Sequence, residues 1–251
     1  MTYCLGMLLE AGLIMIADTR TNAGVDDISS YRKLHCLADA PDRCIFAASA
    51  GNLSTTQTVI SMLREGLPTG EEEGLMRTIA QPTSMFRAAQ LVGEAVQIAN
   101  ETVGKALASI KISGASSILL GGRIGNGPPS LYLIYSAGNF IECKPDMPFF
   151  QIGETKYGRP ILDRVIAPGT TLAEAMKIGF LSFDASIRSN LAVGRPLDLM
   201  VMPAGKRSRV LRHRIDEDDA YFTDLSVRWG DLLQHAAEAI PDPPFMRDLD
   251  S

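Results

Sequence analysis

Residues 1–20 read MTYCLGMLLEAGLIMIADTR, and this stretch fixes the first layer of the fold. The apolar runs Leu5–Leu9 and Leu13–Ala17 are separated by Glu-Ala-Gly, which predicts a β-hairpin with Gly12 free to adopt a positive φ. Each run is apolar on both faces, which is typical of strands buried inside a layered core.

The order of the later elements favours a four-layer α+β fold. Strands, two helices, strands, two helices, strands and a helix follow one another, whereas a parallel doubly wound sheet requires strict alternation. We therefore expect an αββα sandwich: two antiparallel sheets face to face, with helices outside. Without a linker or composition break, we expect one domain over residues 1–251, with a tail from about 241 to 251. Further strands are expected at Cys44–Ser49, Ser116–Leu120, Leu131–Tyr135, Asn139–Glu142, Phe149–Ile152, Asp198–Met202 and Ser208–Ile215, and helices near 53–64, 83–108, 157–165, 172–187 and 221–239.

Charge and hydropathy exclude several classes of protein. The chain of 251 residues has a net charge of −5, which argues against nucleic-acid binding because such proteins present a basic face. The apolar start lacks a basic region before it, and Glu10 interrupts it, so it is not expected to be a signal peptide. No apolar run reaches transmembrane length. We expect a soluble, cytoplasmic protein without a membrane partner.

The cysteines and glycines do not predict a metal or cofactor site. The four cysteines form no CxxC pair and no metal-like spacing with the three histidines, so reduced thiols and no metal are expected. The glycine-rich GGRIGNG segment is followed by the strand LYLIY, whereas a phosphate loop precedes a helix. This segment therefore predicts a hairpin turn, and no cofactor is expected.

Polar residues gather at the open end of the first hairpin. With a three-residue loop, Leu9 pairs with Leu13, Thr2 lies opposite Arg20, and Asp18 is the diagonal neighbour of Thr2. The Thr2 hydroxyl, the Asp18 carboxylate and the Arg20 guanidinium then lie on one face of the hairpin, at its open end. These residues alone leave two interpretations open: a reactive site, or an exposed hairpin mouth with satisfied polar ends.

Four motifs carry a family resemblance. The chain reads T-x-C-L-G at its start, then IADTRTNAG, then YRKLHCL around Lys33, then AASAGNLSTTQ. This series resembles the catalytic half of proteasome β-subunits and the bacterial HslV peptidase. The longer strings DTRTNAGVDDISSYRKLH, SAGNLSTTQ and IGETKYGRPILDR resemble more narrowly the Anbu group of bacterial proteasome-like proteases. The resemblance extends to about Met202.

The resemblance implies an N-terminal-nucleophile (Ntn) hydrolase with defined residue roles. By position, Thr2 matches the nucleophile, which removal of Met1 would expose. Asp18 matches the aspartate that holds the catalytic lysine, Lys33 matches that lysine, and Gly51 matches the glycine whose N–H binds the oxyanion. By the same alignment, the substrate-binding positions are Thr21, Tyr31 and Ser49.

The second half of the chain departs from the family pattern. Proteasome β-subunits place an aspartate and a serine where RSNLAVG has Ser189 and Ala192. The serine of the family's GSG motif has no clean counterpart, and Glu154 or Thr155 would substitute for it. Candidate supporting residues are therefore Arg20, Ser189 and Glu154.

These residue types suit a threonine nucleophile. A threonine hydroxyl needs a nearby base, and an unperturbed α-amine has a pKa of about 7.7–8.0. A nearby Lys33 ammonium would lower the pKa of that amine, and Asp18 would keep the partly buried lysine charged.

The sequence thus predicts a threonine peptidase that cleaves peptides or unfolded proteins inside a homo-oligomer, either a ring or an open spiral. It identifies no unfoldase partner. Two alternatives are an Ntn amidase acting on small amides and a non-catalytic scaffold subunit like the proteasome α-subunits. The first is disfavoured because Ntn amidases generally begin with Ser or Cys, and the second because α-subunits carry a helical extension before the first strand.

Overall fold

A computed structural model describes residues 2–22, 28–68, 76–205 and 209–246. Contacts within the chain group into two units, residues 1–216 and 217–251. The second unit contains helix α6 (Ala220–Glu238) and a short 3₁₀ turn, Pro244–Met246. Asp219 caps α6, because its Oδ1 accepts a 2.7 Å hydrogen bond from Phe222 N. The expectation of a single domain with a tail stays a prediction.

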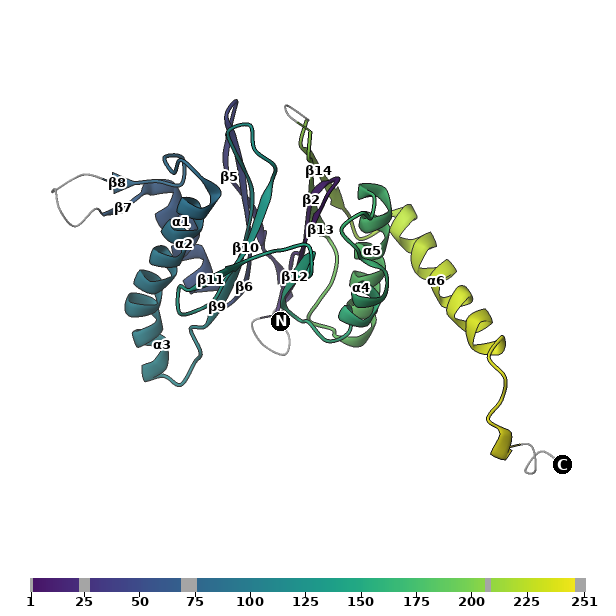
Figure 1. Cartoon of the computed structure of the whole chain (residues 1–251). Helices are drawn as coiled ribbons and strands as arrows, with labels where there is room; N and C mark the ends of the chain where they lie inside the picture. The colour runs from purple at the N-terminus through teal and green to yellow at the C-terminus, as the bar shows by residue number, and fades with distance from the viewer. Residues whose placement is uncertain (1, 23–27, 69–75, 206–208, 247–251) are drawn as a thin grey trace. The chain divides into compact units, whose positions relative to one another are not determined.

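The described residues of the first unit form two five-stranded antiparallel sheets, with helices α1–α3 outside one sheet and α4–α5 outside the other (Figure 1). This arrangement confirms the predicted αββα sandwich. One sheet has the order β12 (Phe149–Gly153), β1 (Tyr3–Leu9), β2 (Gly12–Asp18), β13 (Leu197–Pro203), β14 (Leu211–Ile215). The other has the order β11 (Phe140–Glu142), β10 (Ser130–Ile134), β9 (Ser116–Ile124), β6 (Arg43–Gly51), β5 (Leu34–Ala40). Two short pairs join β3 (Arg20–Asn22) to β4 (Ile28–Ser30) and β7 (Leu67–Pro68) to β8 (Met76–Arg77).

The helices begin at well-capped positions. Asn52 caps α1 (Leu53–Glu65) by accepting from Thr55 N, and Ser84 caps α2 (Met85–Ala99) by accepting from Arg87 N. Thr171 and Glu174 form a reciprocal capping box at the start of α5. The remaining helices of this unit are α3 (Lys105–Ser109), α4 (Arg159–Val165) and α5 (Leu172–Ser189).

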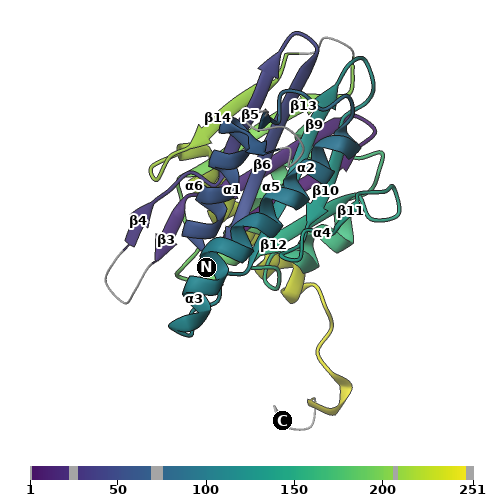
Figure 2. The ribbon, with the colours of Figure 1, turned by 90° about the vertical axis from the view of Figure 1, so that its left-hand side faces the viewer.

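Apolar layers hold the sandwich together. Leu13 and Met15 of β2 meet Phe46 of β6 and Leu119 of β9 between the sheets. A second layer lies between the β6–β9–β10 face and helices α1 and α2, seen from the helix side in Figure 2. Strands β1 and β2 are buried along almost their whole length. This confirms that their two apolar faces belong to a layered core.

The register of the first hairpin differs from the prediction by one residue. Leu9 pairs with Gly12 and Cys4 with Ala17, so the loop has two residues, Glu10 and Ala11. Two-residue loops match the twist of paired strands. Gly12 (φ +144°) lies inside β2, where a Cβ would come within 2.3 Å of the Met202 carbonyl oxygen. A glycine at position 12 thus allows β13 to approach β2 closely. The predicted pairing of Thr2 with Arg20 was wrong, because it assumed a three-residue loop.

Two further segments differ from expectation. The helix expected over 83–108 is interrupted by a π-helical turn, Asn100–Gly104, between α2 and α3. Strand β5 was missed, because its half-buried residues lack a regular apolar alternation. Ser208, the start of the strand expected to end at Ile215, lies outside the described residues, and β14 begins at Leu211. The predicted turn between β9 and β10 is formed by the last three residues of GGRIGNG, whose first four residues end β9.

Candidate functional site

Thr2 lies immediately before β1, and its backbone carbonyl is held by the residue that follows β12. The Glu154 N–H donates a 2.6 Å hydrogen bond to the Thr2 carbonyl. Gly153 has φ +83°, and a Cβ there would lie 1.9 Å from the same carbonyl oxygen. Only glycine fits this approach, because L side chains rarely adopt that backbone conformation. Thr2 is 9% exposed.

A buried ion pair lies beside the peptide bond that joins Thr2 to Tyr3. The Lys33 Nζ donates to Asp18 Oδ1 at 2.7 Å, and the N–H of Tyr3 donates to the same oxygen at 3.0 Å. Lys33 also donates to the Arg20 carbonyl. The one-residue shift in register brings Tyr3 level with Asp18, so the carboxylate joins the backbone next to Thr2 to the Lys33 ammonium.

Burial dominates the electrostatics of this pair. Asp18 is fully buried and Lys33 is 5% exposed. Burial raises the pKa of the Asp18 carboxyl above its ordinary value, and the Lys33 ammonium and the backbone N–H groups of Tyr3 and Gly194 oppose that rise. The ionised carboxylate therefore depends on its lysine partner, and the lysine on its carboxylate.

Gly51 belongs to the sheet opposite the one that carries Thr2 and Asp18. It ends β6 with φ +113°, and a Cβ there would lie 2.2 Å from the Ala115 carbonyl oxygen. Two residues earlier, the Ser49 N–H donates to the Lys33 carbonyl at 3.0 Å, and the Ser49 carbonyl accepts from Cys4 Sγ at 3.6 Å. Since Cys4 follows Thr2 by two residues, the ends of β1 and β6 that carry Thr2 and Gly51 meet across the core.

The second half of the chain contributes a carboxylate that is 4% exposed, Glu154. Its Oε2 accepts a 2.7 Å hydrogen bond from Asn190 Nδ2, and its Oε1 accepts from Lys156 N at 3.1 Å. Ser189, which the sequence suggested, is exposed. Sequence reasoning missed Asn190, and the available signal was its position next to Ser189 in the departing RSNLAVG motif.

Three other predicted residues lie on the segments that follow Asp18 or precede Lys33. Arg20 Nη1 donates to the Leu191 carbonyl at 3.3 Å. The Tyr31 N–H donates to the Thr19 carbonyl at 2.8 Å, and the Tyr31 side chain is 40% exposed. Thr21 Oγ1 is buried without a hydrogen-bond partner among the described residues.

Within the part of the chain that the structure describes, no cluster of three or more His, Cys, Asp or Glu side chains could hold a metal ion. Across the same residues, none of the helices combines the length and apolar character needed to cross a membrane.

Solved structures share this fold and most of its length. Anbu from Yersinia bercovieri is 40% identical, with 96% of this chain and 98% of that chain covered and a TM-score of 0.86. Anbu from Pseudomonas aeruginosa is 40% identical (97% and 98% covered, TM-score 0.87), and Anbu from Hyphomicrobium sp. strain MC1 is 42% identical (97% and 100%, TM-score 0.83). The chain belongs to the Anbu family.

Membership in the Anbu (ancestral beta-subunit) family confirms the resemblance inferred from the motifs, and with it the proteasome-like Ntn-hydrolase fold. The Pseudomonas aeruginosa structure is described as a helical assembly of the Anbu complex. No family model matches this sequence, and no curated protein does.

Proposed function

We propose that this Anbu-family chain is a threonine peptidase whose nucleophile is Thr2. The proposal requires removal of Met1, which lies outside the described residues. One observation carries it: the buried Lys33–Asp18 pair is hydrogen-bonded to the peptide beside Thr2. A buried ion pair costs desolvation, so its place beside a terminal threonine is better explained by chemistry than by stability.

In the proposed reaction the free α-amine of Thr2 accepts the proton of its own hydroxyl, and Oγ attacks the substrate carbonyl. The Lys33 ammonium disfavours protonation of the amine, which keeps it available as a base near neutral pH. The Gly51 N–H stabilises the oxyanion of the tetrahedral intermediate; losing such a donor costs about 3 kcal/mol. The amine then protonates the departing amine of the substrate, and water hydrolyses the acyl ester.

The neighbouring residues are assigned supporting roles. Glu154 would position Thr2, because its N–H donates a hydrogen bond to the Thr2 carbonyl. The Glu154 side chain would be held in turn by its hydrogen bond from Asn190. Arg20 would hold the Leu191 loop beside the site. Thr21, Tyr31 and Ser49 would contact the substrate.

Labelling with a threonine-reactive peptide electrophile tests the proposal. We expect one adduct on a peptide that begins at Thr2, no adduct in Thr2→Ala, and strongly slowed labelling in Lys33→Ala. Intact mass should show that Met1 is absent. Retention of Met1 in protein from the native host would refute the mechanism, because the required amine would be acylated.

Substrate profiling separates the peptidase from its alternatives. Turnover of peptides without turnover of small acyl amides supports a peptidase, and the reverse favours an amidase. A wild-type chain with neither turnover nor labelling would be a scaffold subunit.

We further propose that the chain works inside a homo-oligomer of many subunits. The helical assembly of the Pseudomonas aeruginosa relative supports this, and so does the hazard of an unguarded protease. A small rotation per subunit decides between a closed ring and an open spiral. Light scattering should give a mass several times that of the 27.1 kDa chain, and a monodisperse monomer at micromolar concentration would contradict the proposal.

A further inference from the structure

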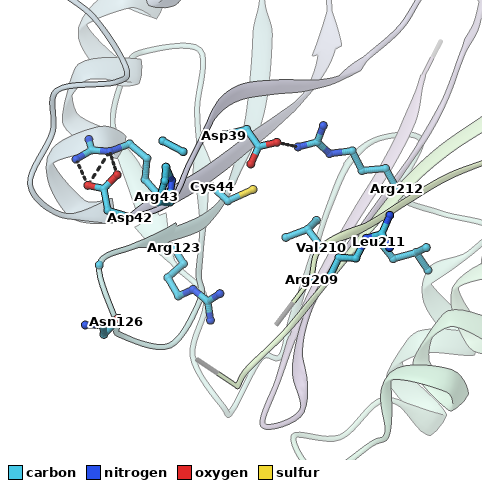
Figure 3. Close-up of a pocket in the computed structure, with 13 residues that line it drawn as sticks. Asp39, Asp42, Arg43, Cys44, Arg123, Asn126, Arg209, Val210, Leu211 and Arg212 are labelled. Carbon is cyan, nitrogen blue, oxygen red and sulfur yellow. Dashed lines mark hydrogen bonds and ion pairs between the residues drawn. The ribbon is translucent and has the colours of Figure 1, made fainter. Parts of the chain in front are cut away.

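An arginine-lined cavity of about 1060 Å³ opens between the two sheets at the end remote from Thr2 (Figure 3). One wall comes from the β5–β6 turn and the end of β9, and the facing wall from residues 209–212. The cavity residue Arg43 and the candidate-site residue Gly51 lie eight residues apart on strand β6. This strand is paired with β9 over that whole length. That length of strand is about 26 Å, so the cavity is separate from the candidate active site.

Carboxylates neutralise only part of the positive charge in this cavity. Of its four arginines, Arg43 pairs with Asp42 at 2.7 Å and Arg212 with Asp39 at 2.5 Å. The other two have no carboxylate partner within the described ranges. These two are Arg123, which donates to the Gly205 carbonyl at 2.9 Å, and Arg209, for which the described residues supply no hydrogen bond or ion pair.

The two uncompensated guanidinium groups come from opposite walls. Arg123 belongs to β9 of one sheet, and Arg209 precedes β14 of the other (Figure 3). Two such cations on facing walls of one cavity attract an anion that can bridge them.

We propose that this cavity binds a small molecule carrying several phosphate groups, bridged between Arg123 and Arg209. Planar guanidinium groups bind phosphate oxygens in a bidentate manner, and a cavity of this volume accommodates a compound of nucleotide size. Ala40, Pro41 and Val210 supply apolar wall for an organic body. The proposal is independent of the proposed peptidase activity.

Calorimetric titration of the full-length protein with inorganic tripolyphosphate tests this site. We expect saturable binding, weaker at high salt, and at least tenfold weaker in Arg123→Gln and in Arg209→Gln, because each variant loses a charge-assisted contact. Arg164→Gln is the matched control: Arg164 is an exposed arginine of α4 whose Nη1 likewise donates to one backbone carbonyl, that of Pro160. Its affinity should equal that of the wild type.

Further titrations make each outcome decisive. Monophosphate should bind more weakly than tripolyphosphate, because it carries less negative charge and fewer phosphate oxygens to pair with the two arginines. Citrate that binds as tightly as tripolyphosphate would overturn the phosphate assignment. Absence of saturable binding, or equal loss in the Arg164 control, would overturn the site. Thermal unfolding without ligand should show that the variants fold, and Arg209→Lys supplies a variant that keeps the charge. Thr2→Ala should retain full binding, whatever its effect on hydrolysis.

Discussion

Replacing Lys33 by methionine should destabilise the fold as well as abolish hydrolysis. The substitution keeps the length of the side chain but removes the charge that faces Asp18 at 2.7 Å. Asp18 has no exposed surface, so its carboxylate would remain buried without a counter-ion. Breaking such a pair costs about 3–5 kcal/mol of unfolding free energy. For a chain of this size that corresponds to a fall in Tm of about 6–20 °C.

The double variant Lys33→Met/Asp18→Asn distinguishes the charge effect from lost packing. Asparagine keeps an acceptor oxygen for the Tyr3 N–H and carries no charge, so the double variant should recover about 2 kcal/mol or more relative to Lys33→Met. Urea unfolding followed by circular dichroism measures both variants. A Lys33→Met cost below about 1 kcal/mol, or a double variant as unstable as the sum of the singles, would refute this reasoning.

The cost in Lys33→Met should also depend on pH. Burial already raises the pKa of Asp18, and losing the ammonium raises it further. The folded state then binds a proton that the unfolded state, with an ordinary aspartate, releases. The penalty therefore grows as the pH rises above the ordinary pKa of an aspartate, and it shrinks as the pH falls back toward that value. Unfolding measured from pH 7 down to pH 4 should show the variant approaching the wild type.

Three other substitutions test the site and its surroundings. Gly153→Ala should abolish turnover, because its Cβ would meet the Thr2 carbonyl oxygen at 1.9 Å, whereas Gly127→Ala, with open space around it, should leave kcat/KM unchanged. Glu154→Gln replaces the carboxylate that accepts hydrogen bonds from Lys156 N and Asn190 Nδ2. We expect kcat/KM to fall about tenfold without loss of stability. An unchanged rate would exclude a positioning role for Glu154. Burial, assisted by a nearby arginine, lowers the pKa of His35 to about 4 from 6.5, so the stability from its neutral form is present above pH 6.5 and lost as the pH falls toward 4. Urea unfolding at pH 7 and pH 5 should show a loss of about 2 kcal/mol that His35→Gln lacks.

The sequence alone determined the features that depend on local patterns. Runs that are apolar on both faces are typical of strands within a layered core, and β1 and β2 are buried there. The grouping of strands and helices determined the αββα class, because strictly alternating elements would have made a parallel sheet. The motifs that resemble those of proteasome β-subunits identified the residues of the candidate site.

Only the tertiary structure decided how those residues meet. The hairpin register shifted by one because the approach of β13 requires Gly12 inside the strand, and local turn preference does not contain that contact. Asn190 reaches Glu154 from 36 residues away, and Gly153 faces Thr2 across a strand pair formed by opposite halves of the chain. Such contacts depend on how distant segments pack, whereas strand and helix preferences act over neighbouring residues.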